Sequence, residues 1–200
     1  MTCCVPRGLP SAAPVGWVVA VLAGRDAGGH DSRVVGETVA LLAPQAPVVI
    51  VSTDAEPGPL QGYGVPVVAS ECSGAAGMLL AALDWTSKNA WERPWVATVP
   101  AGWDRVPPDL FTRLAGVIGG SGAQAGCIAE GGQLVLDLGL WPVRLRQALR
   151  RVVAASREAG RDAHITDWAR EFAIAVTDLA TLWPSAQCAL RPAAPPAQPT

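Results

Sequence analysis

The sequence predicts an α/β protein: a three-layer α/β/α sandwich around a mostly parallel, doubly wound sheet. From Gly16 onward, short β-rich runs alternate with longer helical segments. The runs are almost continuously apolar, which is typical of parallel strands covered on both faces. The chain has 200 residues, half of them hydrophobic, and this is enough to bury the core of one domain.

Four apolar runs, each bounded by Gly, Pro or Ser, predict buried strands: Trp17–Leu22, Val48–Ser52, Val65–Ala69 and Trp95–Val99. Helices are expected between or after them, at Glu37–Leu42, Ala75–Thr86 and Pro108–Ile118. The last begins with proline and an acid and is expected to stop at Gly119-Gly120.

The second half has weaker strand signals. Leu134–Leu138 alternates enough to predict a strand, and Ala173–Val176 is expected to join the sheet as an antiparallel edge. Arg144–Arg157 predicts an amphipathic helix. The domain is expected to span residues 15–187, because the Pro-rich tails 1–14 and 188–200 lack apolar periodicity.

The composition excludes several classes of protein. With 15 Lys+Arg against 17 Asp+Glu, the net charge of -2 excludes a nucleic-acid binder held by a basic field. No apolar run approaches the roughly 18 residues of a membrane span, so a cytoplasmic protein is expected. Five cysteines without a C-x-x-C motif argue against a disulfide framework or a zinc site. Lys88 is the only lysine and Asn89 the only asparagine.

A glycine-rich segment follows the first predicted strand, from Leu22 to Arg33. Ligands of open parallel sheets bind beyond the carboxyl ends of the strands, and glycines let backbone amides approach a phosphate. Neither G-x-G-x-x-G nor the P-loop motif is present. The residues alone leave open a ligand loop and an ordinary Gly-rich turn.

Four segments together resemble a known family. Leu22-Ala23-Gly24 followed by Gly28-Gly29-His30-Asp31 resembles a shortened L-A-G-G-x-x-x-R-M-G-x-D-K signature of the molybdenum cofactor guanylyltransferases, the MobA-like NTP transferases. The other three segments, in the family's order, are Ser73–Leu83, Trp95–Leu110 and Leu138–Pro142. The resemblance implies a Rossmann-like nucleotidyltransferase fold and a role in making molybdopterin dinucleotide cofactors.

The resemblance also implies the residues of a site. The nucleotide-binding residues would be Leu22, Ala23, Gly24, Gly28, Gly29, Asp31 and Ser32. Further pocket residues would be Ser70, Glu71, Gly74, Gly77 and Trp103. In the family, a lysine neutralises charge on the attacked phosphate and an aspartate holds Mg²⁺, the two devices that lower the barrier to nucleotidyl transfer.

The chain departs from the family at the charged positions. The catalytic lysine falls on Ser32, with Arg33 beside it, and the metal-binding aspartate falls on Gly102, two residues before Asp104. Arg25 stands where the family has glycine and is expected to obstruct the ligand. The family's N-x-N-T-P motif has only Leu182-Trp183-Pro184-Ser185 as its nearest counterpart. Trp103 either fills vacated space or stacks on a ligand ring.

Three functions therefore remain. The expected one is a relative with lost or much reduced nucleotidyl transfer, a pseudoenzyme that binds GTP or another nucleotide, molybdopterin, or a partner such as a molybdoenzyme or a maturation protein. The alternative is an active nucleotidyltransferase that uses Arg33 as catalytic cation and Asp104 as ligand of Mg²⁺. The third is a non-enzymatic interaction protein on the same fold.

Overall fold

The computed structural model describes residues 16–25, 31–103, 106–161 and 163–182. The strands are β1 (Trp17–Ala23), β2 (Val49–Thr53), β3 (Val67–Ala69), β4 (Trp95–Pro100), β5 (Ala125–Glu130), β6 (Gln133–Pro142) and β7 (Ile174–Asp178). The α-helices are α1 (Ser32–Leu42), α2 (Gly74–Asn89), α3 (Leu110–Ser121), α4 (Arg146–Glu158), α5 (Ile165–Ala169) and α6 (Leu179–Leu182). Two 3₁₀ helices are η2 (Gly58–Tyr63) and η3 (Val143–Leu145).

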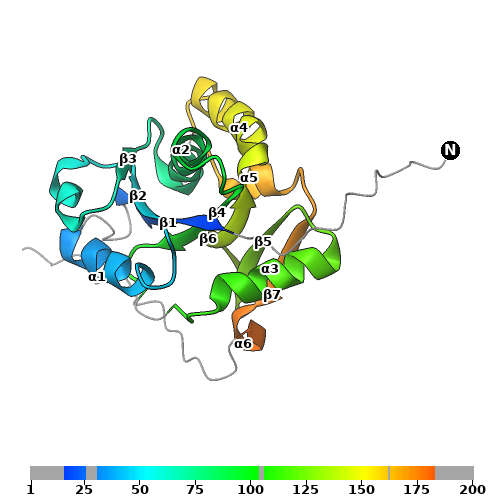
Figure 1. Cartoon of the computed structure of the whole chain (residues 1–200). Coiled ribbons are helices and arrows are strands. Elements are labelled where there is room, and N and C mark those ends of the chain that lie inside the picture. Colours follow the sequence, from blue (N-terminus) through cyan, green and yellow to red (C-terminus); the bar gives the residue numbers. More distant parts are fainter. Residues whose placement is uncertain (1–15, 26–30, 104–105, 162, 183–200) are drawn as a thin grey trace, which may run out of the picture.

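The strands of the described residues pair in one seven-stranded sheet of order β3-β2-β1-β4-β6-β5-β7. Strand β6 runs antiparallel to both of its neighbours, and every other pairing is parallel. Helices α1 and α3 cover one face, and α2, α4 and α5 cover the other (Figure 1). The predicted α/β/α sandwich with a mostly parallel sheet is confirmed.

Two cores hold the layers together, one on each face of the sheet. The side chains of β1 alternate between them, because successive residues of a strand point to opposite faces: Val19 and Val21 join the α1/α3 core, whereas Val18 and Ala20 join the α2/α4 core. All four residues are fully buried. This explains why the strand reads as an unbroken apolar run.

The first four strands lie within two residues of their predicted bounds, but two predicted helix bounds are wrong and one strand was missed. Helix α1 begins at Ser32 instead of Glu37, because Asp31 caps it by accepting a hydrogen bond from Arg33 N at 3.0 Å. Helix α3 continues through Gly119-Gly120 and stops at Gly122, which adopts a left-handed conformation (φ 68°). Strand β5 was not expected at all.

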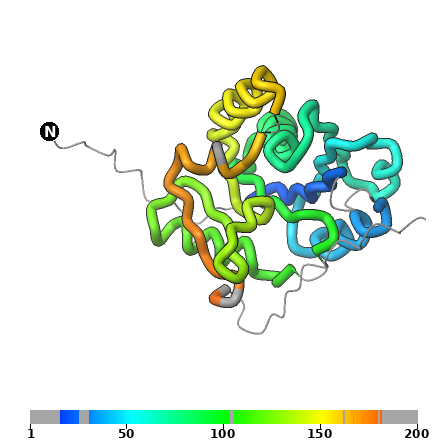
Figure 2. Tube along the Cα trace, turned by 180° about the vertical axis from the view of Figure 1, so that it is seen from behind, coloured from blue at the N-terminus to red at the C-terminus, as the bar shows by residue number. Residues whose placement is uncertain are grey.

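The predicted antiparallel edge is also wrong. Strand β7 lies at the edge of the sheet but runs parallel to β5, and the antiparallel strand is β6. Seen from behind, β7 in orange lies beside the green β5–β6 segment (Figure 2). Because β6 is antiparallel, its early residues lie toward the carboxyl end of β4.

A buried hydroxyl joins β4 to β6. Thr98 Oγ1 accepts hydrogen bonds from Gly139 N at 3.2 Å and from Trp141 Nε1 at 3.0 Å, and both Thr98 and Trp141 are fully buried. Thr98→Val keeps the shape but leaves two N–H groups without this acceptor, so we expect the free energy of unfolding to fall by about 2 kcal/mol. Urea unfolding measures the change.

Thr86→Val is the matched control for this prediction. Thr86 is equally buried, but its hydroxyl only donates to Ala82 O within α2. Its replacement orphans no N–H group and should cost under about 1 kcal/mol. Equal losses in the two variants would contradict the role given to Thr98.

Candidate functional site

Three loops meet at the carboxyl edge of the sheet. Ala23, Thr53 and Ala69, the last residues of β1, β2 and β3, are in register. Thr53 Oγ1 donates to Ala23 O at 2.8 Å, and Ser70 N donates to Thr53 O at 2.7 Å. The residues that follow these strands, Gly24 among them, therefore leave the sheet side by side, as expected for the ligand-binding edge of an open α/β sheet.

Asp54 ties two of these loops together. One carboxylate oxygen accepts from Arg25 N at 3.0 Å and the other from Gly74 N at 2.8 Å, and the residue is only 8% exposed. Gly74 is the first residue of α2, whose N-cap Ser73 forms no side-chain capping bond. Asp54 thus caps α2 from a neighbouring strand. An acid directly after a buried strand was the available sequence signal, and it was missed.

The turn from β3 into α2 needs glycine at two positions. Gly74 has φ +83°, a conformation that strains other residues. At Gly77, an added Cβ would lie 2.4 Å from Cys72 O and 2.7 Å from Ser70 Oγ. Ser70 Oγ also donates to Cys72 O at 2.6 Å, so this turn is closed against the first turn of α2. Of the predicted pocket residues, Ser70, Gly74 and Gly77 lie together in this turn, whereas Glu71 is exposed.

Ser32 and Arg33 lie in the first turn of α1 rather than in a loop. The Arg33 side chain is 71% exposed, and its Nε lies 3.7 Å from Glu37 Oε1 one helical turn away. Ser32 O accepts a hydrogen bond from the Tyr63 hydroxyl of η2. The carboxylate of Asp31 occupies the N-terminus of this helix, so the negative charge favoured at that end by the helix dipole is supplied by the chain itself.

Arg25 was expected to obstruct the ligand, but its side chain is held against the neighbouring loop after β2. Its Nε donates to Asp54 O at 2.8 Å, so the side chain crosses from the end of β1 to the end of β2. Trp103 is 3% exposed and belongs to the α1/α3 core. Core packing therefore describes Trp103, and a side chain so buried offers no face for stacking on a ligand. Gly28, Gly29, His30 and Asp104 lie outside the described residues.

The carboxylates of the described residues are poorly arranged to bind Mg²⁺. Within the described part of the chain, no three His, Cys, Asp or Glu side chains are grouped so as to hold a metal ion. Both carboxylate oxygens of Asp54, the buried acid at this edge, already accept hydrogen bonds from backbone amides. The described side chains therefore do not form a metal-binding site that could support a catalytic step.

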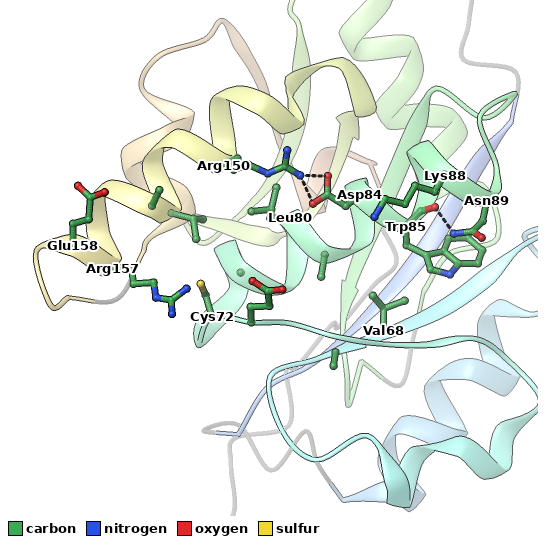
Figure 3. Close-up of a pocket in the computed structure, with 16 residues that line it drawn as sticks. Val68, Cys72, Leu80, Asp84, Trp85, Lys88, Asn89, Arg150, Arg157 and Glu158 are labelled. Atoms are coloured by element: carbon green, nitrogen blue, oxygen red, sulfur yellow. Dashed lines mark hydrogen bonds and ion pairs between the residues drawn. The ribbon is translucent and has the colours of Figure 1, made fainter.

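Lys88 and Asn89 lie far along α2 from this edge, as predicted. They line a groove of about 940 Å³ between α2, α4 and β3 (Figure 3). Across it, the Arg150 guanidinium of α4 pairs with both Asp84 oxygens at 2.5 Å, and Asn89 Nδ2 donates to Trp85 O. Because α2 leads into the start of β4, these residues lie toward the amino ends of the strands.

A further carboxylate, Asp137, lies in β6 near the carboxyl end of β4. Thr98 pairs with Gly139, so Asp137 is two residues further toward that end, where the pairing with β5 is irregular. Burial raises the pKa of this carboxyl above its usual value. The strand predicted at Leu134–Leu138 contains Asp137, but its antiparallel direction was not predicted, so the sequence did not place this carboxylate near the end of β4.

Asp137→Asn should stabilise the protein at pH 7. A raised folded-state pKa adds stability that is present below the unfolded-state pKa and is lost as the pH rises through the folded-state value. The asparagine variant cannot ionise, so its free energy of unfolding should exceed that of the wild type at pH 7, with the difference shrinking toward pH 4. Urea unfolding at both pH values measures this. A variant that is less stable at pH 7 would contradict it.

The described helices include none long and apolar enough to cross a membrane. In comparisons with known proteins, the profile of the MobA-like NTP transferase domain matches residues 27–171. A molybdenum cofactor guanylyltransferase of Bradyrhizobium sp. (strain ORS 278) is 31% identical over 138 residues, 68% of this chain and 62% of the relative. One of Rhodopseudomonas palustris (strain HaA2) is 32% identical over 156 residues, 73% of each chain.

The chain spans less than two thirds of several such relatives, including 60% of the molybdenum cofactor guanylyltransferase of Nitrobacter hamburgensis, which is 35% identical over 125 residues. Among solved structures, molybdopterin-guanine dinucleotide biosynthesis protein A from Archaeoglobus fulgidus has the same fold, with a TM-score of 0.64 at 14% identity over 82% of this chain and 85% of that one. The match of the profile across most of the chain establishes the family, and the chain belongs to the MobA-like NTP transferases.

Proposed function

We propose that this protein binds a nucleotide, GTP first among them, at the carboxyl edge of β1, β2 and β3, and that it serves the maturation of a molybdopterin dinucleotide cofactor with nucleotidyl transfer lost or much reduced. The guanylyltransferase relatives motivate the choice of GTP and of molybdopterin as ligands. The proposal rests on a contrast at this edge. Hydrogen bonds hold the backbone of the loops in place, whereas the cationic side chains that nucleotidyl transfer would need lie elsewhere or close to other groups of the chain.

The framework supports nucleotide binding. The Asp54 bonds to Arg25 N and Gly74 N hold the end of β1 and the start of α2 at fixed positions. The residues proposed to contact the nucleotide are Leu22, Ala23, Gly24, Gly28, Gly29, Asp31, Ser32, Ser70, Glu71, Gly74 and Gly77. A preorganised backbone is what phosphate and base recognition at such an edge require.

The placement of charge supports weak or absent catalysis. Both helix N-termini at this edge, those of α1 and α2, already carry a carboxylate of the chain, from Asp31 and Asp54. The only lysine, Lys88, lies in the last turn of α2, away from the carboxyl ends of the strands. Arg33, the cation of the alternative active enzyme, is highly exposed and lies close to Glu37. In the alternative of an active enzyme, Asp104 would bind the cofactor Mg²⁺.

Calorimetry and a turnover assay test the proposal. GTP, CTP and ATP are titrated into the full chain with and without Mg²⁺, and the protein is then incubated with GTP and molybdopterin while pyrophosphate release is followed. We expect GTP to bind without measurable pyrophosphate release. Release that depends on Mg²⁺ and is abolished by Asp104→Asn would instead establish the active enzyme. Absence of binding by every nucleotide and by molybdopterin would leave only an interaction role.

A further inference from the structure

Arg25 is held at the candidate site by two hydrogen bonds to one residue. Its backbone N–H donates to Asp54 Oδ1 at 3.0 Å, and its side-chain Nε donates to Asp54 O at 2.8 Å. Asp54 is itself fixed by Gly74 N at 2.8 Å and is 8% exposed. The guanidinium is therefore anchored over the carboxyl end of β2 rather than free to sample solvent.

Among the described residues, the terminal amino groups of this guanidinium have no hydrogen-bond or ion-pair partner. Arg25 is an exposed residue and forms no ion pair among the described residues. The Asp54 oxygens face backbone amides, so the carboxylate does not form an ion pair with the guanidinium. A positively charged planar fork with its Nε already bonded presents its two NH₂ groups outward.

The neighbouring anion sites are occupied by the protein itself. The N-terminus of α1 carries Asp31, and that of α2 carries Asp54. Within the described part of the chain, Arg25 is a cation at the junction of the loops after β1 and β2 whose terminal amino groups these contacts leave unused. A phosphate is the ligand group that matches a fixed guanidinium fork, because two N–H groups can bind two of its oxygens.

We propose that Arg25 is the phosphate-binding residue of this site, anchored by Asp54 to hold a phosphate oxyanion of the ligand. The proposal rests on the proposed function for the identity of that ligand, which is either the polyphosphate of a nucleotide or the phosphate monoester of molybdopterin. The exposed position and the anchoring through Nε leave the guanidinium accessible to such a ligand.

Isothermal calorimetry with inorganic tripolyphosphate, GTP and molybdopterin tests this, using wild type, Arg25→Gln, Arg25→Lys and Arg151→Gln. Arg25→Gln should weaken tripolyphosphate binding about 10- to 100-fold. Arg25→Lys keeps the charge but loses the Nε anchor and the fork, so its affinity should fall between the two. Arg151 is exposed on α4, and Arg151→Gln changes the net charge equally while altering affinity less than about 2-fold. Unchanged melting temperatures show that the fold is kept.

The outcomes separate this proposal from the proposed function. A loss confined to GTP assigns Arg25 to the nucleotide, and a loss confined to molybdopterin assigns it to the pterin phosphate. Equal GTP and molybdopterin affinity in wild type and Arg25→Gln overturns the role of Arg25 and leaves the proposed function standing. Arg25-dependent binding of tripolyphosphate with no added affinity for GTP or molybdopterin keeps the anion site and overturns the proposed function. No binding of any ligand to the wild type overturns both.

Discussion

Gly77→Ala is expected to lower the free energy of unfolding by at least about 3 kcal/mol and to abolish nucleotide binding. The new Cβ would lie 2.4 Å from the carbonyl oxygen of Cys72, a backbone atom that cannot rotate aside as a side chain would. Relief requires the β3–α2 turn to move away from the helix. Because Gly74 and its bond to Asp54 lie in that turn, the shift would also disturb the candidate site. Urea unfolding and GTP calorimetry measure the two effects.

Gly116→Ala is the matched control for that substitution. Gly116 lies inside α3, and an added Cβ there would meet no atom within 4 Å. Alanine is the better helix former, so this variant should gain about 0.5–1 kcal/mol. If Gly77→Ala were as stable as Gly116→Ala, the close approach of the β3–α2 turn to α2 would be contradicted.

The parallel half of the sheet could be predicted because burial leaves a strong pattern. Strands β1 and β2 have both faces covered, so every residue is apolar or small and the run stands out from its Gly, Pro and Ser boundaries. The pattern gives the strands and the loops that follow them. It says nothing about which groups in those loops contact each other.

Part of β6 was predicted as a strand at Leu134–Leu138, but β5 and the hairpin that joins the two strands were missed for a physical reason. Gly126 and other small residues in β5 weaken the strand signal. At Gly126 the small residue is required by the close packing of α3, because an added Cβ would lie 2.8 Å from the Ile118 side chain. The connecting Gly131-Gly132 pair adopts positive φ at both positions, which is the geometry of a type I′ hairpin turn. That dipeptide was the local signal available for an antiparallel strand.

The candidate site, too, could be predicted only in part from the sequence. The resemblance pointed to the glycine loop and the β3–α2 turn, whereas Asp54 and the anchored Arg25 depend on contacts between residues 20 and 29 positions apart in the chain. Such pairings arise from the register of β1, β2 and β3, which no local pattern encodes. Arg25 seemed an obstacle in the sequence because only its bulk could be judged there, not the direction of its side chain.

Asp54→Asn tests the contact that joins the two loops. Asparagine keeps the size of the side chain but replaces one acceptor oxygen by an NH₂ group, which would face a backbone N–H of either Arg25 or Gly74. The variant loses at least one charge-assisted hydrogen bond and gains a donor–donor contact in a nearly buried place, so we expect a loss of about 3 kcal/mol in the free energy of unfolding. GTP affinity should fall as well, because the start of α2 and the Arg25 anchor both shift.

Asp109→Asn is the control variant. Asp109 is the exposed N-cap of α3, and its replacement weakens the ion pair with Arg113, which should cost under about 1 kcal/mol. A GTP affinity unchanged by Asp54→Asn would mean that the clamp between β2 and α2 supports the fold alone, and the ligand would then have to be held by groups other than those Asp54 positions.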